Sequence, residues 1–173
     1  FSRQQAEFCG YTDRQISHRL SRGDWKRIHR DAFAITGSPP SFEQRIQAAT
    51  LAFPNSVASH ITAAWLHDQK VEPPHLVTLI RLGNTGGSAP GLDIRRTLWL
   101  PSRHLVIVHG IPATSRVRTL FDLSTELTAD RLRTLIDNEL AKRRVTLTQL
   151  ERMGREMMRS GRPGSALFGE ILR

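Results

Sequence analysis

The sequence has few thiols and no long apolar run, and each shortage excludes a class of protein. Cys9 is the only cysteine among 173 residues, which excludes an internal disulfide or a thiolate metal cluster and is typical of a reducing compartment. No apolar run approaches the roughly 20 residues that span a bilayer, and no signal-peptide pattern is present. We therefore expect a cytoplasmic protein with no membrane partner.

Residue patterns that bind metals or provide nucleophiles are also scarce. The pairs His60/His67 and His104/His109 lack the i,i+4 spacing that places two ligands on one helix face. Ser59 precedes His60, as a nucleophile beside a base would, but its position before an apolar segment favours a helix cap. These patterns predict no metal site and no hydrolytic Ser–His pair.

Signatures of nucleotide or nuclease chemistry are missing as well. The loop around Gly83, Gly86 and Gly87 lacks the Lys-Ser/Thr ending of a phosphate loop and is interpreted as a hairpin connection. Asp93 lacks the nearby second carboxylate and lysine that a metal-dependent nuclease needs. The sequence therefore predicts no catalytic residues, no cofactor and no enzyme activity in these residues.

What the sequence does have is arginine. It carries 25 Lys and Arg against 16 Asp and Glu, a formal net charge of +9, and only Lys26, Lys70 and Lys142 are lysines. Arginine offers a planar fork of donors that suits phosphate oxygens and guanine edges, so a polyanionic partner is favoured. A general preference for arginine on the surface is the alternative. The basic residues are spread along the chain, so charge alone does not locate a site.

The first 36 residues have the pattern of two short helices followed by a basic ribbon. Ser2 with Gln5, and Thr12 with Gln15, are capping-box pairs that predict helices at about 2–9 and 12–21. Gly10 and Gly23 suit helix ends, and two helices joined this way are typical of a helix-turn-helix. Residues 25–35, with a turn at Arg30–Asp31, then predict a β-ribbon.

One face of the second helix is the candidate recognition surface. At about 100° per residue, Ile16 and Leu20 fall together and predict the buried side. The opposite side suits a major groove, where arginine reads guanine and glutamine reads adenine, and the ribbon suits phosphate or minor-groove contacts. An ordinary solvated helix face is the alternative. The predicted DNA-binding residues are Arg14, Gln15, His18, Ser21, Arg22, Lys26, Arg27 and Arg30.

Residues 37–40 (GSPP) break regular structure and predict a boundary between domains at 1–36 and 41–173. The second domain is predicted to combine several helices with a small sheet of about three strands at 75–82, 93–100 and 104–108. The helices are expected at 41–53, from Ser59, and at about 115–124, 129–143, 149–159 and 164–172. Arg118 and Asp122, four residues apart, predict an intrahelical ion pair.

A second basic stripe is formed by Arg152, Arg155 and Arg159, on the side of a helix opposite Leu150, Met153 and Met157. It is interpreted first as a solvated helix surface and second as an auxiliary phosphate-contacting face.

Three stretches of the chain resemble, in order, the AbiEi-type antitoxin and regulator family of abortive-infection (type IV toxin–antitoxin) systems. They are residues 1–35, residues 57–68 (VASHITAAWLHD) and residues 108–127 (VHGIPATSRVRTLFDLSTEL), and the run from Gly110 to Leu123 is the most specific. The resemblance implies a winged helix-turn-helix that represses its own operon at inverted repeats. It also implies a C-terminal α/β domain that counteracts a nucleotidyltransferase-like toxin, typically without a stable toxin–antitoxin complex. By position, Arg14, Gln15, His18 and Arg22 correspond to the recognition helix and residues 26–30 to the wing.

The chain departs from the family pattern in three places. The family has one more helix before the segment that starts at Phe1, so we expect the helix-turn-helix core to be partly uncovered here. The turn of the ribbon is Arg30-Asp31 where Arg-Gly is usual, and Asp tolerates positive φ less well. Many relatives continue into a nuclease-like domain of the very-short-patch-repair type, which these residues do not include.

The sequence thus predicts an α+β protein that binds double-stranded DNA as a transcriptional repressor. One alternative is the DNA-targeting portion of a very-short-patch-repair-like endonuclease whose catalytic domain lies outside these residues. Another is a protein-interaction module that holds a partner through residues 41–173.

Overall fold

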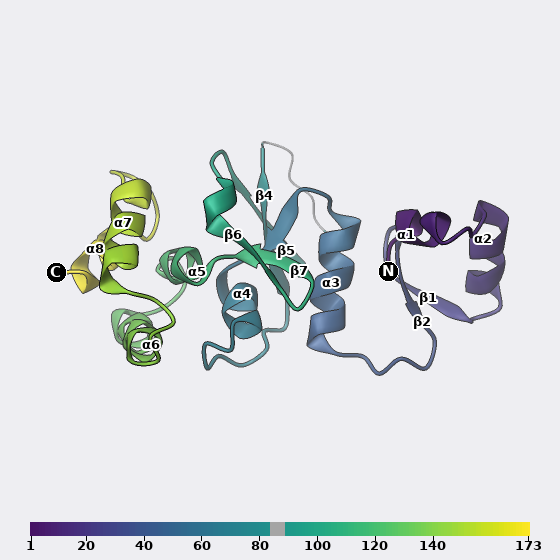
Figure 1. The fold of residues 1–173 in the computed structure, drawn as a ribbon, viewed down its shortest axis with the longest axis horizontal. Helices are drawn as coiled ribbons and strands as arrows, with labels where there is room; N and C mark the ends of the chain where they lie inside the picture. The colour runs from purple at the N-terminus through teal and green to yellow at the C-terminus, as the bar shows by residue number, and fades with distance from the viewer. Residues whose placement is uncertain (84–88) are drawn as a thin grey trace. The chain divides into compact units, whose positions relative to one another are not determined.

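The computed structural model describes residues 1–83 and 89–173, and the chain divides into two compact units, Phe1–Ser56 and Val57–Arg173. It is a mixed α/β protein. The described residues form eight α-helices, a two-stranded sheet and a five-stranded mixed sheet (Figure 1). The longest described helix has 13 residues, and none of the helices in these ranges is both long and apolar enough to cross a membrane.

The first unit is built from three helices and one hairpin. Capping boxes at Ser2 and Thr12 start the first two helices, as predicted. The two strands pair antiparallel, with Trp25 opposite Ile35 and an irregularity between Arg27 and His29. The elements are α1 (Arg3–Phe8), α2 (Asp13–Ser21), β1 (Trp25–His29), β2 (Ala32–Ile35) and α3 (Phe42–Ala52).

Helix α3 belongs to this first unit. It contacts both β1 and β2, and Ile46 and Ala49 on it are fully buried. The sequence prediction started the second domain at residue 41, because the Gly-Ser-Pro-Pro segment breaks regular structure. In the structure the helix after that break packs back onto the hairpin, and the division between compact units falls at Ser56.

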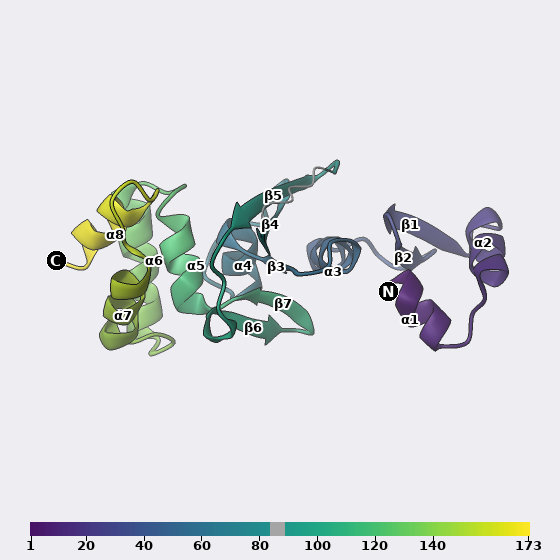
Figure 2. The same cartoon turned by 90° about the horizontal axis from the view of Figure 1, so that it is seen from above.

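The second unit contains the larger sheet, in the strand order β5-β4-β3-β7-β6. Helix α4 contacts β4, α5 lies beside α4, and α6, α7 and α8 lie beyond α5 (Figure 1) (Figure 2). The strands are β3 (Ser56–Ala58), β4 (Val77–Leu82), β5 (Leu92–Thr97), β6 (Leu105–Val108) and β7 (Ile111–Thr114). The helices are α4 (His60–Leu66), α5 (Arg116–Leu123), α6 (Ala129–Ala141), α7 (Leu147–Met157) and α8 (Ser165–Ile171), with a short 3₁₀ turn at Ser102–His104.

The prediction of about three strands was too low, because β3 and β7 have weak sequence signals. Strand β3 is only three residues long, and β7 contains Pro112, a residue that argues against a strand away from a sheet edge. Proline is tolerated here because β7 pairs with β3 only at Ala113, while Pro112 faces Ile107 of β6.

The prediction of a hairpin at residues 83–91 was wrong. Strands β4 and β5 pair in parallel, with Val77 opposite Leu92 and Leu82 opposite Thr97, whereas a hairpin joins antiparallel strands. Gly86 and Gly87, part of the predicted loop signal, lie outside the described residues.

The helices of the second unit share one apolar core. Leu132, Leu150, Met157 and Phe168 are fully buried in it, and the predicted apolar side of α7 is confirmed. Helix α7 starts at Leu147, two residues before the predicted start at 149, because Thr146 caps it, with Gln149 completing a capping box.

A chain of polar side chains runs through the second unit beside this core. Arg118 donates from Nε to Asp122 Oδ1 at 2.8 Å, which confirms the predicted i,i+4 pair, and its Nη1 lies 3.2 Å from His104 Nδ1. His104 Nε2 lies 2.9 Å from Glu156 Oε2, which also accepts from Arg103. Since arginine can only donate, His104 Nδ1 is the acceptor and Nε2 carries the proton given to Glu156.

Candidate nucleic-acid interface

The first two helices are joined by a short turn that sets their relative direction. The connection, Cys9–Thr12, is four residues long, and Gly10 adopts φ +90°, a conformation that a residue with a side chain rarely takes. Tyr11 then returns toward the first helix, its N–H donating to the carbonyl of Ala6. A connection of this length with a glycine is what two helices need in order to cross at a steep angle.

The inner side of α2 holds the helix against the hairpin. Ile16 is fully buried and Leu20 is half-buried, as the periodicity predicted. They pack with Ala6, Trp25 and Phe33, around which the aromatic rings of Phe1 and Tyr11 also gather, with centroids 4.8 Å and 5.1 Å from that of Trp25. This small core fixes the orientation of α2, so the outer side of the helix is also fixed.

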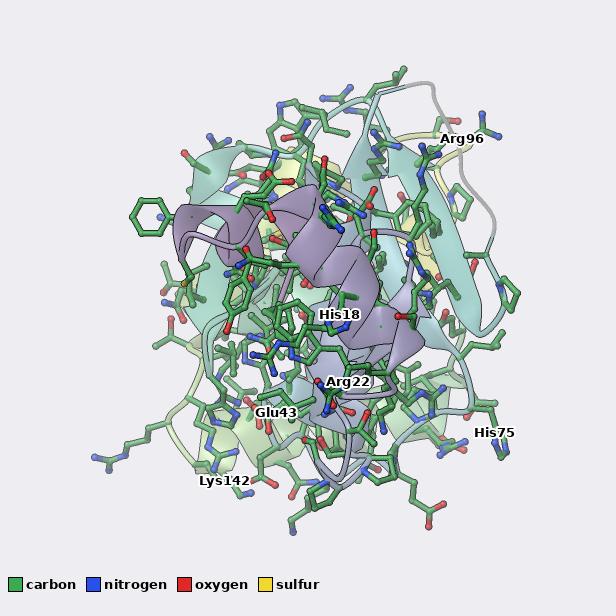
Figure 3. All side chains as sticks on the ribbon, turned by 90° about the vertical axis from the view of Figure 1, so that its right-hand side faces the viewer. His18, Arg22, Glu43, His75, Arg96 and Lys142 are labelled. Carbon is green, nitrogen blue, oxygen red and sulfur yellow. The ribbon has the colours of Figure 1, made fainter. Side chains whose placement is uncertain are left out.

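The outer side of α2 is exposed along its whole length. The side chains of Arg14, Gln15, His18, Ser21 and Arg22 are all exposed, and Figure 3 shows His18 and Arg22 along this helix. A shallow hollow of about 390 Å³ lies on this surface. Its walls are formed by Tyr11, Arg14, Gln15, His18, Arg19, Arg22 and Asp24.

Two of the predicted base-contacting groups already have partners within the helix. Gln15 Oε1 accepts from the Thr12 backbone N–H at 2.8 Å, and the Ser21 hydroxyl donates to the His18 carbonyl at 2.9 Å. Bidentate reading of adenine would require both side-chain atoms of Gln15. Gln15 can therefore offer Nε2 as a donor while its oxygen stays in the cap.

The three predicted basic residues of the ribbon differ in how exposed their side chains are. Arg30, at the turn, has a side chain 94% exposed, and Arg27 is exposed with its guanidinium 5.3 Å from the centre of the Phe33 ring. Lys26 is half-buried. Asp31 adopts φ 58°, the left-handed conformation that a glycine at this turn would adopt more readily.

Arg3 joins the turn of the ribbon to the start of the candidate recognition helix, and the sequence analysis did not identify it. Its guanidinium pairs with Asp13, the first residue of α2, and its Nε lies 3.2 Å from Asp31 Oδ1. These two carboxylates raise the pKa of Arg3. The aspartate at the turn thus holds the ribbon at a fixed place relative to α2, a contact that glycine could not make.

Arg19 is a second residue that the sequence analysis left out. It lines the hollow, lies 3.4 Å from Asp24 Oδ2 through Nη1, and places its guanidinium 5.9 Å from the centre of the Tyr11 ring. Its spacing to Gln15 (i,i+4) and Arg22 (i,i+3) was a signal that it shares their face.

The helix-turn-helix core was expected to be partly uncovered, but Ala6, Ile16, Trp25 and Phe33 in it are buried. Apolar surface is exposed beside α1 instead. Phe8 is 93% exposed, and it lines a groove together with Phe1 and Leu51.

The other sequence candidates for chemistry have structural partners. His67 Nε2 bonds the Thr114 carbonyl at 2.7 Å, and Asp93 pairs with Arg95 at 2.9 Å. Ser59 occupies the N-cap position of α4, as predicted, but its hydroxyl lies 3.0 Å from His60 Nδ1 instead of bonding the helix N–H groups, and both residues are buried. Across residues 1–83 and 89–173, no group of three His, Cys, Asp or Glu side chains could hold a metal ion.

Buried histidines are expected to make the protein sensitive to acid. Burial lowers the pKa of His60 from 6.5 to about 3, so between these values the unfolded chain binds the proton and the folded one does not. The contribution of His60 to the free energy of unfolding is fully present above pH 6.5. It falls as the pH is lowered, by about 3 kcal/mol at pH 4. Burial also lowers the pKa of His67 and His104, whereas Asp122, whose pKa burial raises to about 6, acts in the opposite direction.

The contribution of His60 can be isolated with His60→Asn. Asparagine tolerates the positive φ of this residue, 51°, and has no titratable group in this range. Urea unfolding between pH 7 and 4 should show a shallower loss of stability in the variant, and parallel curves for both proteins would contradict the assignment.

Comparison with known proteins gives a structural neighbour and no sequence family. No protein-family model and no curated protein matches the chain. The chain is similar to the crystal structure of the RV2827C protein from Mycobacterium tuberculosis, with a TM-score of 0.64 over 97% of this chain and 67% of that chain. The sequence identity is 16%, so the likeness concerns the fold alone.

Proposed function

We propose that the chain is a sequence-specific repressor of transcription that binds double-stranded DNA through a winged helix-turn-helix formed by its first 36 residues. In this proposal α2 is the recognition helix, and the β1–β2 hairpin is the wing. The protein acts by occupying DNA and performs no catalysis with these residues.

The order and pairing of the elements support a winged helix. Phe1 and Ser2 run beside β2: the Phe33 N–H donates to the Phe1 carbonyl at 2.8 Å, and Ser2 pairs with Ala32. The chain then forms two helices joined by a four-residue turn and returns as the hairpin. A recognition helix followed by a ribbon is thereby packed on one aromatic core.

The single observation that carries the proposal is the exposed polar side of α2, opposite buried Ile16. Arg14, His18 and Arg22 lie on it without burial, and Arg27 and Arg30 extend the basic character onto the hairpin. A helix that inserts in the major groove needs its base-facing side free of intramolecular packing. Arg14 meets this need best, because Arg22 lies 3.8 Å from Asp24.

The resemblance to AbiEi-type regulators extends the proposal to an antitoxin of a type IV toxin–antitoxin system that represses its own operon. The partner would then be an operator with inverted repeats, and the second unit would counteract a nucleotidyltransferase-like toxin. Gly110 to Leu123, the most specific part of the resemblance, forms β7 and α5 and includes the buried Arg118–Asp122 pair.

Binding to the chain's own upstream region tests the proposal. Fluorescence anisotropy should show tighter binding to that region than to random DNA of the same length and base composition, and a footprint should cover two symmetric half-sites. Equal affinity for both DNAs at several salt concentrations would contradict sequence-specific repression.

A further inference from the structure

The second unit contains a cavity of about 560 Å³ between β6, the start of α5 and the outer side of α7. We propose that this cavity binds a small phosphate monoester whose remaining part is apolar or aromatic. The site is separate from the DNA-binding proposal, since its residues lie between His67 and Glu156 and none belongs to α2 or the hairpin.

The walls of the cavity are strongly basic. Four arginines line it, and Glu156 is the one acidic residue among the lining side chains. Glu139 and Asp68 lie behind two of these arginines as ion-pair partners, and the group remains positive when both are counted. An anion is therefore the ligand that this cavity favours. The four arginines are Arg103, Arg116, Arg144 and Arg152.

Arg116 is held in place before any ligand binds. Its Nη1 donates to the His67 carbonyl at 2.8 Å and to Glu139 Oε2 at 2.9 Å. These two bonds use both hydrogens of Nη1, whereas Nε–H and the Nη2 hydrogens have no acceptor among the described residues. A planar guanidinium fixed along one edge can present its other edge to two oxygens of one phosphate.

Two further kinds of donor meet Arg116 at the cavity. Arg152, on the exposed side of α7, has no hydrogen-bond or ion-pair partner among the residues that the structure describes. The backbone N–H groups of Arg116 and Val117 are the first two of α5, where no carbonyl of the preceding turn can accept them. Guanidinium groups together with free helix N–H groups suit a doubly charged phosphate better than a carboxylate or a singly charged diester.

Part of the cavity lining is apolar, and this determines which group the ligand can carry besides its phosphate. Ile107 is 70% exposed and Val106 is 37% exposed, both on the edge strand β6. Met153 of α7 also lines the cavity. The volume lies within the range of about 300–1,000 Å³ usual for small-molecule sites. A phosphate group on the arginines with an apolar or aromatic ring on β6 fits both parts of the lining.

Titration with inorganic phosphate and with adenosine monophosphate tests the site on the full chain. In amide NMR spectra, adenosine monophosphate should shift the signals of Arg116 and Val117 and those of Val106 and Ile107, while phosphate should shift only the first pair. Shifts spread over arginine-rich surfaces with none at Arg116 and Val117 would overturn the proposal.

Arg152→Glu is expected to weaken the binding of adenosine monophosphate about tenfold or more, measured by calorimetry. Arg155→Glu is the matched control, because it makes the same charge change on the same helix but does not line the cavity. Equal weakening by both variants would show a diffuse electrostatic effect and overturn the site. A dinucleotide whose only phosphate is a phosphodiester tests whether the site requires a monoester. If it binds as tightly as adenosine monophosphate, the monoester assignment is overturned.

Discussion

Replacing Arg118 with methionine is expected to lower the free energy of unfolding of the second unit by about 3–5 kcal/mol at pH 7. Arg118 is 1% exposed, and its partner Asp122 is 5% exposed. Removing the guanidinium leaves a buried carboxylate whose Oδ2 already has no hydrogen-bond partner among the described atoms. His104 Nδ1 loses its donor as well. The loss should shrink on acidification, because burial raises the pKa of Asp122 to about 6 and a protonated carboxyl needs no counter-charge.

Urea unfolding followed by tryptophan fluorescence measures this effect, since Trp65 and Trp99 lie in the second unit and Trp25 in the first. Arg133→Met is the control: its pair with Asp130, at 3.8 Å, is exposed, and a change below about 1 kcal/mol is expected. Combining Arg118→Met with Asp122→Leu should recover most of the loss, because no uncompensated charge remains. A loss no greater than that of the control would show that the buried pair is dispensable.

Arg14→Ala and Arg27→Ala are expected to weaken DNA binding in different ways. Because Arg14 lies on the outer side of α2, its substitution should weaken the binding free energy for the operator by about 1–3 kcal/mol. It should also relax the preference at one base position. Arg27, on the hairpin, should weaken binding to all DNA alike and reduce the slope of log affinity against log salt by about 1. Fluorescence anisotropy at several salt concentrations, with the operator and with single-base variants, measures both effects.

Arg131→Ala serves as the control for this pair, because Arg131 is an exposed arginine of α6 in the other unit. It should leave both affinity and salt slope nearly unchanged. If Arg14→Ala and Arg27→Ala behave alike across all sequences, α2 does not read bases as proposed.

Within the candidate site, the sequence predicted the elements better than the contacts. The two capping boxes placed α1 and α2, and periodicity identified Ile16 as the buried residue. The ion pairs of Arg3 could not be predicted, because Asp31 is 28 residues away and meets Arg3 only after the hairpin has folded back. The use of Gln15 as a cap residue was visible in the sequence, but its consequence for base reading required the hydrogen bond itself.

In the second unit, too, the sequence predicted the strands of the sheet better than the way they pair. The apolar patterns of β4, β5 and β6 were visible, yet the parallel pairing of β4 with β5 was not, because a pattern along one strand does not encode the direction of its neighbour. The cavity is a product of the same long-range packing, since β6, α5 and α7 supply its walls from separate parts of the chain.

The sequence by itself determined the helices, the capped starts of α1 and α2, the exposed side of α2 and the Arg118–Asp122 pair. Each of these depends on side chains within about four residues of one another. Over that distance, helix geometry determines which side chains come into contact. Only the tertiary structure decided the order of the five strands, the place of α3, and contacts such as that of His104 with Glu156, 52 residues apart. Those contacts arise when separate elements bury their apolar faces together, and no local spacing determines which faces will meet.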